Sequence, residues 1–306
     1  MRKKLLALLF VIILITSSSE NVFARSYIAV DADSDIAEDE DIPMEDDEDS
    51  DIEEDEIYDS VDDVCKVVRD MLLNHEEYIR IAMTLDTYNQ LEDDVILLAT
   101  AIDKKDTSKD GDYLMYSISG WSFYREHTYI DENTETITLN MRMGYHTTLK
   151  QEKKVDTMIK SVLKSLKLEG KSDYTKVKAI HDYIIKRVSY DFTLEKYSAY
   201  NALIDKSSVC QGYASLAYRM FTEAGIKCRI IGADSHLWNI VKVDGKWYNI
   251  DLTWDDPNTS KGPQVKYTYF LKNSKGFKDH TGYDKIMTKE FKKKYPIAKE
   301  SYKLKK

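Results

Sequence analysis

Apolar and polar positions form their clearest pattern in residues 210–257. Beginning at Cys210, apolar residues recur at helical spacing until Gly225, a residue type that commonly follows the end of a helix. Two runs of alternating apolar and polar residues come next, separated by Asp244-Gly245, a preferred two-residue hairpin turn. The pattern predicts a helix that starts at Cys210, followed by an antiparallel hairpin with strands over 237–243 and 246–251.

This hairpin brings a histidine close to a carboxylate. If the turn pairs Val243 with Lys246, His236 lies opposite Thr253, and Asp251 is displaced along the diagonal. A diagonal neighbour across an antiparallel pair lies roughly 7–8 Å away, close enough for a carboxylate to reach an imidazole. We therefore expect Asp251 to orient the ring of His236 so that the ring accepts a proton from a thiol.

Cys210 stands where a nucleophilic thiol would be activated. The positive end of a helix dipole and the unpaired backbone N–H groups of the first turn favour a thiolate over a thiol. The same N–H groups can stabilise negative charge on a carbonyl oxygen. A lone cysteine is usually a small core residue, but a cysteine at a helix start with a histidine and an aspartate on adjacent strands indicates a cysteine acyl-transfer site.

The same region resembles the transglutaminase-like superfamily. Its secreted bacterial members share the motifs V-C-x-G-Y-A, A-G-I, H-x-W-N and G-x-W-Y-x-I/V-D-x-T-W-x-D-P, which match residues 209–214, 224–226, 236–239 and 245–257. A lead-in similar to K-A-I-H-D-Y-I-I-x-x-V-x-Y-D ends at Asp191, and Tyr269-Phe270-Leu271 and Asp279-His280 resemble the family's tail. The likeness departs from the motifs only at Ser208, where Gly is common, and at Leu237, where Ala is common.

The resemblance implies an α+β, papain-like fold, in which a helix bearing the cysteine packs on an antiparallel sheet bearing the histidine and the aspartate. It implies that Cys210 is the nucleophile, His236 the general base and acid, and Asp251 the orienting carboxylate, with no cofactor. The first expectation is a cysteine peptidase or other amide hydrolase acting on a protein or peptide. One alternative is a protein-glutamine gamma-glutamyltransferase that cross-links Gln to Lys; another is a non-catalytic cell-wall-binding module.

Other residues near the motifs are candidates for the same site. Tyr190 and Gln211 are candidates for stabilising the oxyanion, although a buried tyrosine is often bonded to backbone instead. Trp238 and Trp254 are candidates for lining a substrate cleft, although aromatic residues on strands are more often core. His181 lies among apolar residues of a predicted helix and is interpreted as a packing histidine.

The N-terminal residues have two patterns that differ from the rest of the chain. Residues 1–24 resemble a signal peptide, with Arg2-Lys3-Lys4, an apolar run too short for a comfortable membrane span, and a small-residue cleavage site at Ala24. We expect a secreted, extracellular protein without stable membrane insertion after cleavage; an uncleaved anchor is the alternative. Residues 25–59 are predicted to be a disordered acidic linker, because residues 31–59 hold 18 Asp and Glu and no Lys or Arg.

Charge and cysteine content narrow the classes of partner. From residue 60 onward, 40 Lys and Arg stand against 35 Asp and Glu, a balance that suits an anionic cell-wall or membrane surface. Three cysteines are too few for a disulfide-built protein of this size, although a bridge between Cys65 and Cys228 is conceivable. No Cys/His cluster has metal-ligand spacing, and no nucleic-acid motif occurs, so we expect neither a metal nor a nucleic-acid partner.

Residues 60–147 have the pattern of a separate, smaller α+β module. We expect helices over 61–73 and 89–102, strands over 78–85, 113–119 and 136–143, and a continuing meander over 124–129. The catalytic domain is then predicted to span residues 148–306. It begins with a helix that ends near Gly170 and finishes in a Lys-rich C-terminal tail.

Overall fold

A computed structural model describes residues 56–91, 94–101, 107–131, 134–257 and 264–304. The predicted signal peptide and most of the predicted acidic linker lie outside these residues. The described residues form two compact units: the N-unit holds 56–100 and 118–144, and the C-unit holds 101–117 and 145–304. The chain thus enters the C-unit at residue 101, leaves it, and returns, so the contiguous module predicted over 60–147 differs from the observed division at 101–117.

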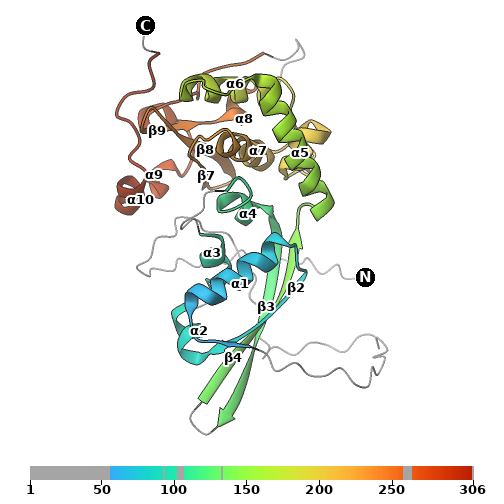
Figure 1. The fold of residues 1–306 in the computed structure, drawn as a ribbon. Helices are drawn as coiled ribbons and strands as arrows, with labels where there is room; N and C mark the ends of the chain where they lie inside the picture. The colour runs from blue at the N-terminus through green and yellow to red at the C-terminus, as the bar shows by residue number, and fades with distance from the viewer. Residues whose placement is uncertain (1–55, 92–93, 102–106, 132–133, 258–263, 305–306) are drawn as a thin grey trace, which may run out of the picture. The chain divides into compact units, whose positions relative to one another are not determined.

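The N-unit is a four-stranded sheet with helices. The strand order is β1-β2-β4-β3, with β1 parallel to β2 and β2 antiparallel to β4; the strands are β1 (Ile57–Tyr58), β2 (Tyr78–Thr84), β3 (Ile118–Asp131) and β4 (Thr134–Tyr145). The helices are α1 (Val61–Leu73), α2 (Leu85–Leu91) and α3 (Val95–Thr100) (Figure 1). Helix α1 contacts α3 and β2 and buries Val64, Val68 and Leu72, three positions at helical spacing.

The predictions for this region are partly right. The helix over 61–73 and the strands over 78–85 and 136–143 are confirmed, and the meander segment 124–129 lies within β3. The helix expected over 89–102 is instead divided between α2 and α3. Residues Ile57–Tyr58, expected within the disordered linker, pair with β2.

The strand predicted over 113–119 is wrong, because residues Asp112–Ser117 form helix α4. The sequence of this segment alternates like a strand, but all six side chains are buried, so the alternation does not separate a buried face from an exposed one. Tertiary contacts fix it within the C-unit. The Asp112 carboxylate accepts hydrogen bonds from the Arg229 guanidinium at 2.7 Å and from the backbone N–H of Ile230 at 2.7 Å.

The C-unit is built around helix α7 (Cys210–Glu223) and a three-stranded antiparallel sheet of order β7-β8-β9. The strands are β7 (Cys228–Ala233), β8 (His236–Val243) and β9 (Lys246–Ile250). Val243 pairs with Lys246, which confirms the predicted turn and register. Both the helix start at Cys210 and the α+β fold class are confirmed.

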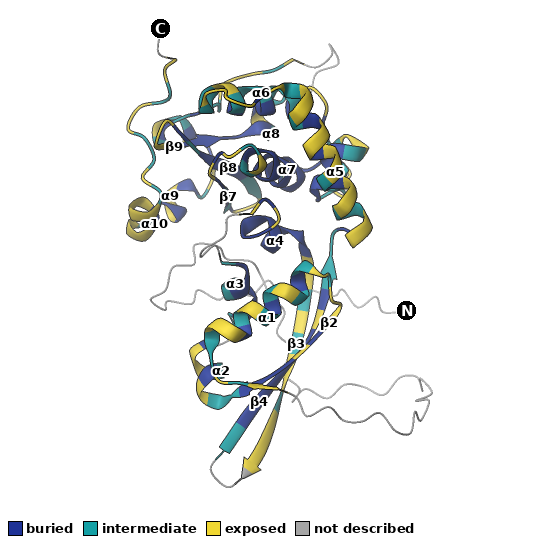
Figure 2. Cartoon of the chain, in the orientation of Figure 1, coloured by how far each residue is buried: buried dark blue, intermediate teal, exposed yellow. Residues whose placement is uncertain are grey.

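Side-chain alternation gives the sheet two faces, and each belongs to a buried cluster. The strands of this sheet are coloured mainly as buried in Figure 2. Ile230, Val241 and Ile250 belong to the same buried cluster as the apolar side of α7. Trp238 and Ile240 belong to a second buried cluster, with Phe277, Tyr283 and Phe291. These three come from η2 (Ser274–Phe277), α9 (Tyr283–Ile286) and α10 (Lys289–Lys294), so part of the Lys-rich C-terminal segment is folded onto the sheet.

Further elements hold the start of α7 in place. Helices α5 (Leu149–Leu166) and α6 (Asp173–Ile185) contact α7, and the short parallel strands β5 (Ser189–Tyr190) and β6 (Ser207–Ser208) pair just before it. A π-helical turn, η1 (Asn201–Asp205), leads into β6, and α8 (Leu252–Asp255) follows β9. Within the described ranges, no helix has both the length and the apolar character needed to cross a membrane.

Candidate active site

Cys210 is the first residue of α7. Its predecessor Val209 has an extended backbone and serves as the N-cap, while β6 and β5 hold the chain that leads into the helix. Gly212 is required here: a Cβ at this position would meet the Ser208 hydroxyl oxygen at 1.8 Å and the Ser198 carbonyl at 2.7 Å. The glycine of the V-C-x-G motif thus lets the first turn of α7 pack directly against its own lead-in.

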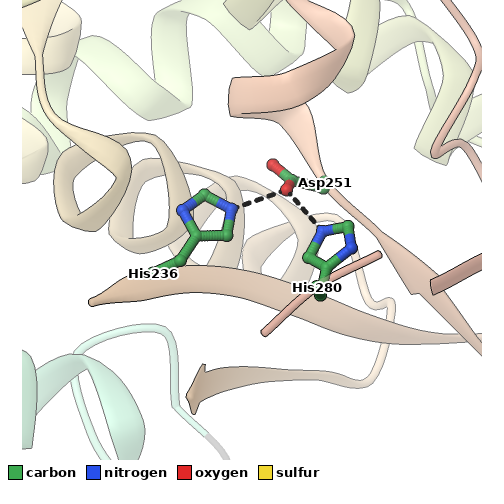
Figure 3. A group of neighbouring side chains, drawn as sticks. All are labelled: His236, Asp251 and His280. Atoms are coloured by element: carbon green, nitrogen blue, oxygen red, sulfur yellow. Dashed lines mark hydrogen bonds and ion pairs between the residues drawn. The ribbon is translucent and has the colours of Figure 1, made fainter. Parts of the chain in front are cut away.

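His236 begins β8 and Asp251 follows the last residue of β9, so the two meet at the open end of the hairpin (Figure 3). The Nε2 atom of His236 lies 2.7 Å from Oδ2 of Asp251. The predicted partner of His236 across the ladder, Thr253, is wrong. The β8–β9 ladder ends at Ile250, and Asp251 turns the chain into α8, where its Oδ1 accepts the backbone N–H groups of Thr253 and Trp254 at 2.9 and 3.1 Å. Asp251 therefore caps a helix with one oxygen and contacts the imidazole with the other.

The pKa values of this pair shift in opposite directions. Burial alone would lower the pKa of His236, but its hydrogen bonds to Asp251 and to Cys210 raise this pKa to about 9. Burial would likewise raise the pKa of Asp251, yet the hydrogen bonds from His236 and His280 hold it below its usual range. Since Nε2 of His236 faces Asp251, the other ring nitrogen, Nδ1, is left for the Cys210 sulfur. The structure brings Cys210, His236 and Asp251 into one hydrogen-bonded chain.

A second histidine shares the same carboxylate oxygen. Nε2 of His280 lies 3.0 Å from Oδ2 of Asp251, and the His280 side chain is almost fully buried. Asp279-His280 resembles the family's tail, but no sequence pattern gives this histidine a role. The ligand atoms of His236, Asp251 and His280 lie within 4.8 Å of one another, a grouping that could hold a metal ion. The spacing of these residues in the sequence does not predict this grouping.

Of the two oxyanion candidates, Tyr190 lies close to the thiol. Burial, and next the charge of Cys210, raise the pKa of the Tyr190 phenol, which keeps the hydroxyl protonated and able to donate a hydrogen bond. The Gln211 side chain is directed elsewhere: its amide donates to the carbonyl of Tyr116 at 2.9 Å. Gln211 can therefore contribute to an oxyanion site through its backbone N–H at the start of α7, but not through this side-chain amide.

The two tryptophan candidates differ. Trp238 is only 1% exposed and belongs to the sheet's second core cluster, so its assignment to a substrate cleft is wrong. The alternation that places it beside His236 also turns it inward. Trp254 is 38% exposed, and its ring stacks on His236 with centroids 5.1 Å apart. Of these two tryptophans, Trp254 remains a candidate for contacting a substrate.

The loop after Tyr190 exposes apolar side chains on a rigid support. The Asp191 carboxylate accepts the Thr193 hydroxyl and the backbone N–H groups of Thr193, Glu195 and Lys196, and these hydrogen bonds hold the pKa of Asp191 at about 2. The carbonyl oxygen of Lys196 in this loop also accepts a hydrogen bond from the backbone N–H of Val209, the residue before Cys210. Phe192 and Leu194 are 76% and 55% exposed on it.

Three further residues with reactive side chains, His181, Cys65 and Cys228, are not part of this site. His181 is fully buried between Asp182 and Asp255, with 3.2 Å to each carboxylate, which confirms its interpretation as a packing histidine. Burial raises the pKa of Cys65 to about 11 and that of Cys228 well above the value of a free thiol. Cys65 and Cys228 are free thiols in the structure, not a bridge.

Comparisons with known proteins show what this part of the chain is similar to. The model of the transglutaminase-like superfamily matches residues 160–252, a segment that contains Cys210, His236 and Asp251. Kyphoscoliosis peptidase from Mus musculus is 27% identical over 133 residues, which are 35% of this chain and 20% of that protein. The Homo sapiens protein of the same name is 27% identical over 108 residues, 28% of this chain and 16% of its own length. The chain thus spans about a fifth or less of these relatives.

Among solved structures, the crystal structure of a TGase aligns with 63% of this chain and 55% of its own, with 16% sequence identity and a TM-score of 0.32. Residues 160–252 are thus similar to the domain that defines the transglutaminase-like superfamily. Members of this superfamily are generally enzymes, either cysteine proteases or transglutaminases.

Proposed function

We propose that this protein is a thiol acyl-transfer enzyme that hydrolyses amide bonds in peptides or proteins. The observation that carries the proposal is the position of His236, which is hydrogen-bonded to the buried Asp251 on one side and to Cys210 on the other. A buried carboxylate that orients an imidazole toward a thiol is the arrangement that activates a cysteine nucleophile.

The proposed reaction has two halves. The Cys210 sulfur attacks the carbonyl carbon, His236 holds the thiol proton, and the resulting oxyanion is stabilised by the N–H groups at the start of α7 and by the Tyr190 hydroxyl. The His236 imidazolium then gives its proton to the departing amine, which leaves an acyl-thioester. In the second half, His236 takes a proton from water, and the water oxygen displaces the thiol to give a carboxylic acid.

A peptide or protein substrate is consistent with the surroundings of the thiol. Trp254 stacks on His236 and is partly exposed, and Phe192 and Leu194 are exposed on the braced loop beside the lead-in to Cys210. Exposed apolar groups near a reactive centre suit a substrate that brings apolar side chains. The name of the similar Kyphoscoliosis peptidases favours hydrolysis over amine transfer for this chain.

The proposed site of action is outside the cell, at or near an anionic cell-wall surface. This part rests on the signal-peptide pattern of residues 1–24 and on the net positive charge from residue 60 onward. Recovery of the protein from the culture medium with a new N-terminus near Arg25 is the expected result. A chain that stays with the cells with Met1 in place would contradict it.

The activity test uses labelled casein with and without a fluorescent primary amine. Peptide release from casein is expected from the wild-type chain, and Cys210→Ala is expected to lower the rate by about 10³-fold or more while keeping the fold. Cys65→Ala, which alters a cysteine of the N-unit, is the matched control and is expected to retain the rate. Incorporation of the amine without peptide release would replace hydrolysis with transamidation, and activity that survives Cys210→Ala would contradict the proposal.

A further inference from the structure

One oxygen of Asp251 receives two imidazole rings. Its Oδ2 lies 2.7 Å from His236 Nε2 and 3.0 Å from His280 Nε2, while Oδ1 is occupied by the N–H groups at the start of α8 (Figure 3). A carboxylate only accepts hydrogen bonds, so both Nε2 atoms are donors. Asp251 is completely buried. Each of its two carboxylate oxygens accepts hydrogen bonds from two donors.

His280 is itself held firmly. It lies between η2 and α9, with its backbone N–H bonded to the Phe277 carbonyl at 3.1 Å. Its ring stacks on Phe277 with centroids 4.2 Å apart and contacts Trp254 at 4.1 Å; Trp238 and Tyr269 meet it edge-on. With 1% of its side chain exposed, His280 is too enclosed to meet a substrate. Its effect on the reaction is therefore indirect, and its hydrogen bond to Asp251 is the contact that reaches the thiol centre through a polar group.

We propose that His280 is a positioning residue for the thiol centre; this inference rests on the proposed function. With Oδ1 fixed by two backbone N–H groups and Oδ2 fixed by His280, the carboxylate cannot rotate about its side-chain bond without losing hydrogen bonds in a buried site. The direction left open on Oδ2 points to His236. His280 thereby holds His236 as the tautomer with a proton on Nε2 and directs Nδ1 toward Cys210.

The charged groups around His280 fit this role. Asp251 faces Nε2, and Asp279, from the same segment, faces Nδ1 at 3.2 Å with 54% of its side chain exposed. The Tyr269 hydroxyl donates to the other oxygen of Asp279. The His236 ring is a further titratable neighbour, with its centroid 5.7 Å away. The ring of His280 is thus fixed at both nitrogens as well as on its faces.

A divalent cation is the rival occupant of this cluster. The three ligand atoms are close enough to one another, and two histidines with one carboxylate form a common ligand set. However, separations of 2.7 and 3.0 Å are those of hydrogen bonds, and a cation would replace the proton on His236 Nε2 that orients the ring. Each of the three side chains already has a hydrogen-bond partner, so the geometry favours positioning.

The test compares His280→Leu with His280→Gln in the full chain. The side-chain amide of glutamine can place an N–H where His280 has Nε2, whereas leucine fills space without a donor. The readout is the iodoacetamide alkylation rate of Cys210 as a function of pH, measured well below the melting temperature of each variant. His280→Leu is expected to slow alkylation at about pH 6 by roughly 10- to 100-fold, and His280→Gln by no more than about threefold.

The outcomes separate the two claims. Fast alkylation in wild type together with equal rates in both variants and wild type would overturn the role of His280 and leave the proposed function standing. A wild-type Cys210 no faster than an ordinary thiol would overturn the proposed function itself. Equimolar zinc bound to the wild-type protein after dialysis, lost in both variants, would assign the cluster to a metal. Fast Cys210 alkylation in wild-type protein that holds no zinc, together with the expected slowing in His280→Leu, supports positioning.

Discussion

The C-unit contains two histidine–carboxylate clusters that are built as opposites. In the thiol cluster, one carboxylate, Asp251, lies between two rings, His236 and His280. In the buried cluster, one ring, His181, lies between the carboxylates of Asp182 and Asp255. Both clusters link distant parts of the chain, yet only the first includes a sulfur and a histidine ring that reaches solvent.

The two clusters differ in the solvent access of their histidine and in the presence of a nucleophile. His236 keeps 18% of its side chain exposed and is hydrogen-bonded to Cys210, whereas His181 is fully covered, with Tyr267 stacked on it and Phe270 edge-on. The Asp255 carboxylate also accepts the backbone N–H of Tyr269 at 2.9 Å, so it serves as a fold anchor. A buried histidine–aspartate pair is therefore no sign of catalysis unless a reactive group adjoins it.

The largest expected effect is the difference in turnover between the asparagine variants of Asp251 and Asp255. Asp251→Asn should lower turnover by about 10³- to 10⁴-fold, because an amide in place of the carboxylate no longer holds His236 in the productive tautomer. Asp255→Asn should leave turnover per folded molecule within about threefold and lower the free energy of unfolding by roughly 1–3 kcal/mol. Steady-state rates and urea unfolding of both variants measure this contrast. Near-normal turnover in Asp251→Asn would show that the orienting carboxylate is misassigned.

Replacing His181 is expected to lower the stability of the protein and to leave the reactivity of Cys210 unchanged. His181→Leu leaves the buried Asp255 without its imidazole partner, so we expect a loss of about 2–4 kcal/mol in the free energy of unfolding. At a temperature where the variant stays folded, the alkylation rate of Cys210 should match that of wild type. A large fall in that rate, with the fold intact by circular dichroism, would mean that the buried cluster also takes part in the chemistry.

The smallest expected effect is on the pH dependence of stability. The pKa of His236 is raised to about 9, above its ordinary value, so its stabilising contribution is complete below about pH 6.5 and is lost as the pH rises through about 9. The free energy of unfolding of wild type relative to His236→Gln should therefore shrink by roughly 1–3 kcal/mol between these limits. Urea midpoints across this range provide the measurement, and a gap that does not change with pH would contradict the raised pKa.

Local sequence patterns were sufficient for the parts of the site that form within one supersecondary unit. The turn at Asp244-Gly245 and the helix stop at Gly225 placed β8, β9 and α7, and with them Cys210, His236 and Asp251. The register failed only beyond Ile250, where the Asp251 side chain caps α8 and ends the ladder.

What the sequence could not provide depends on tertiary contacts. His280 joins Asp251 across a sequence separation of 29 residues, with no periodic pattern between them. The segment of α4 alternates like a strand but is buried all round and held by Arg229, so its environment decided its conformation. Trp238 and Trp254 look alike in the motifs, and only the fold shows that one is core and the other partly exposed.

The most direct test of the account is the alkylation rate of each cysteine against pH, read by peptide mass spectrometry. The account predicts that Cys210 alone reacts fast well below the pKa of about 8.5 of a free thiol, and that His236→Ala removes this advantage. Cys65 and Cys228, whose pKa values burial raises, should react slowly and serve as internal controls. A Cys210 that reacts no faster than these two would contradict the enzyme assignment and leave a binding module with the same fold.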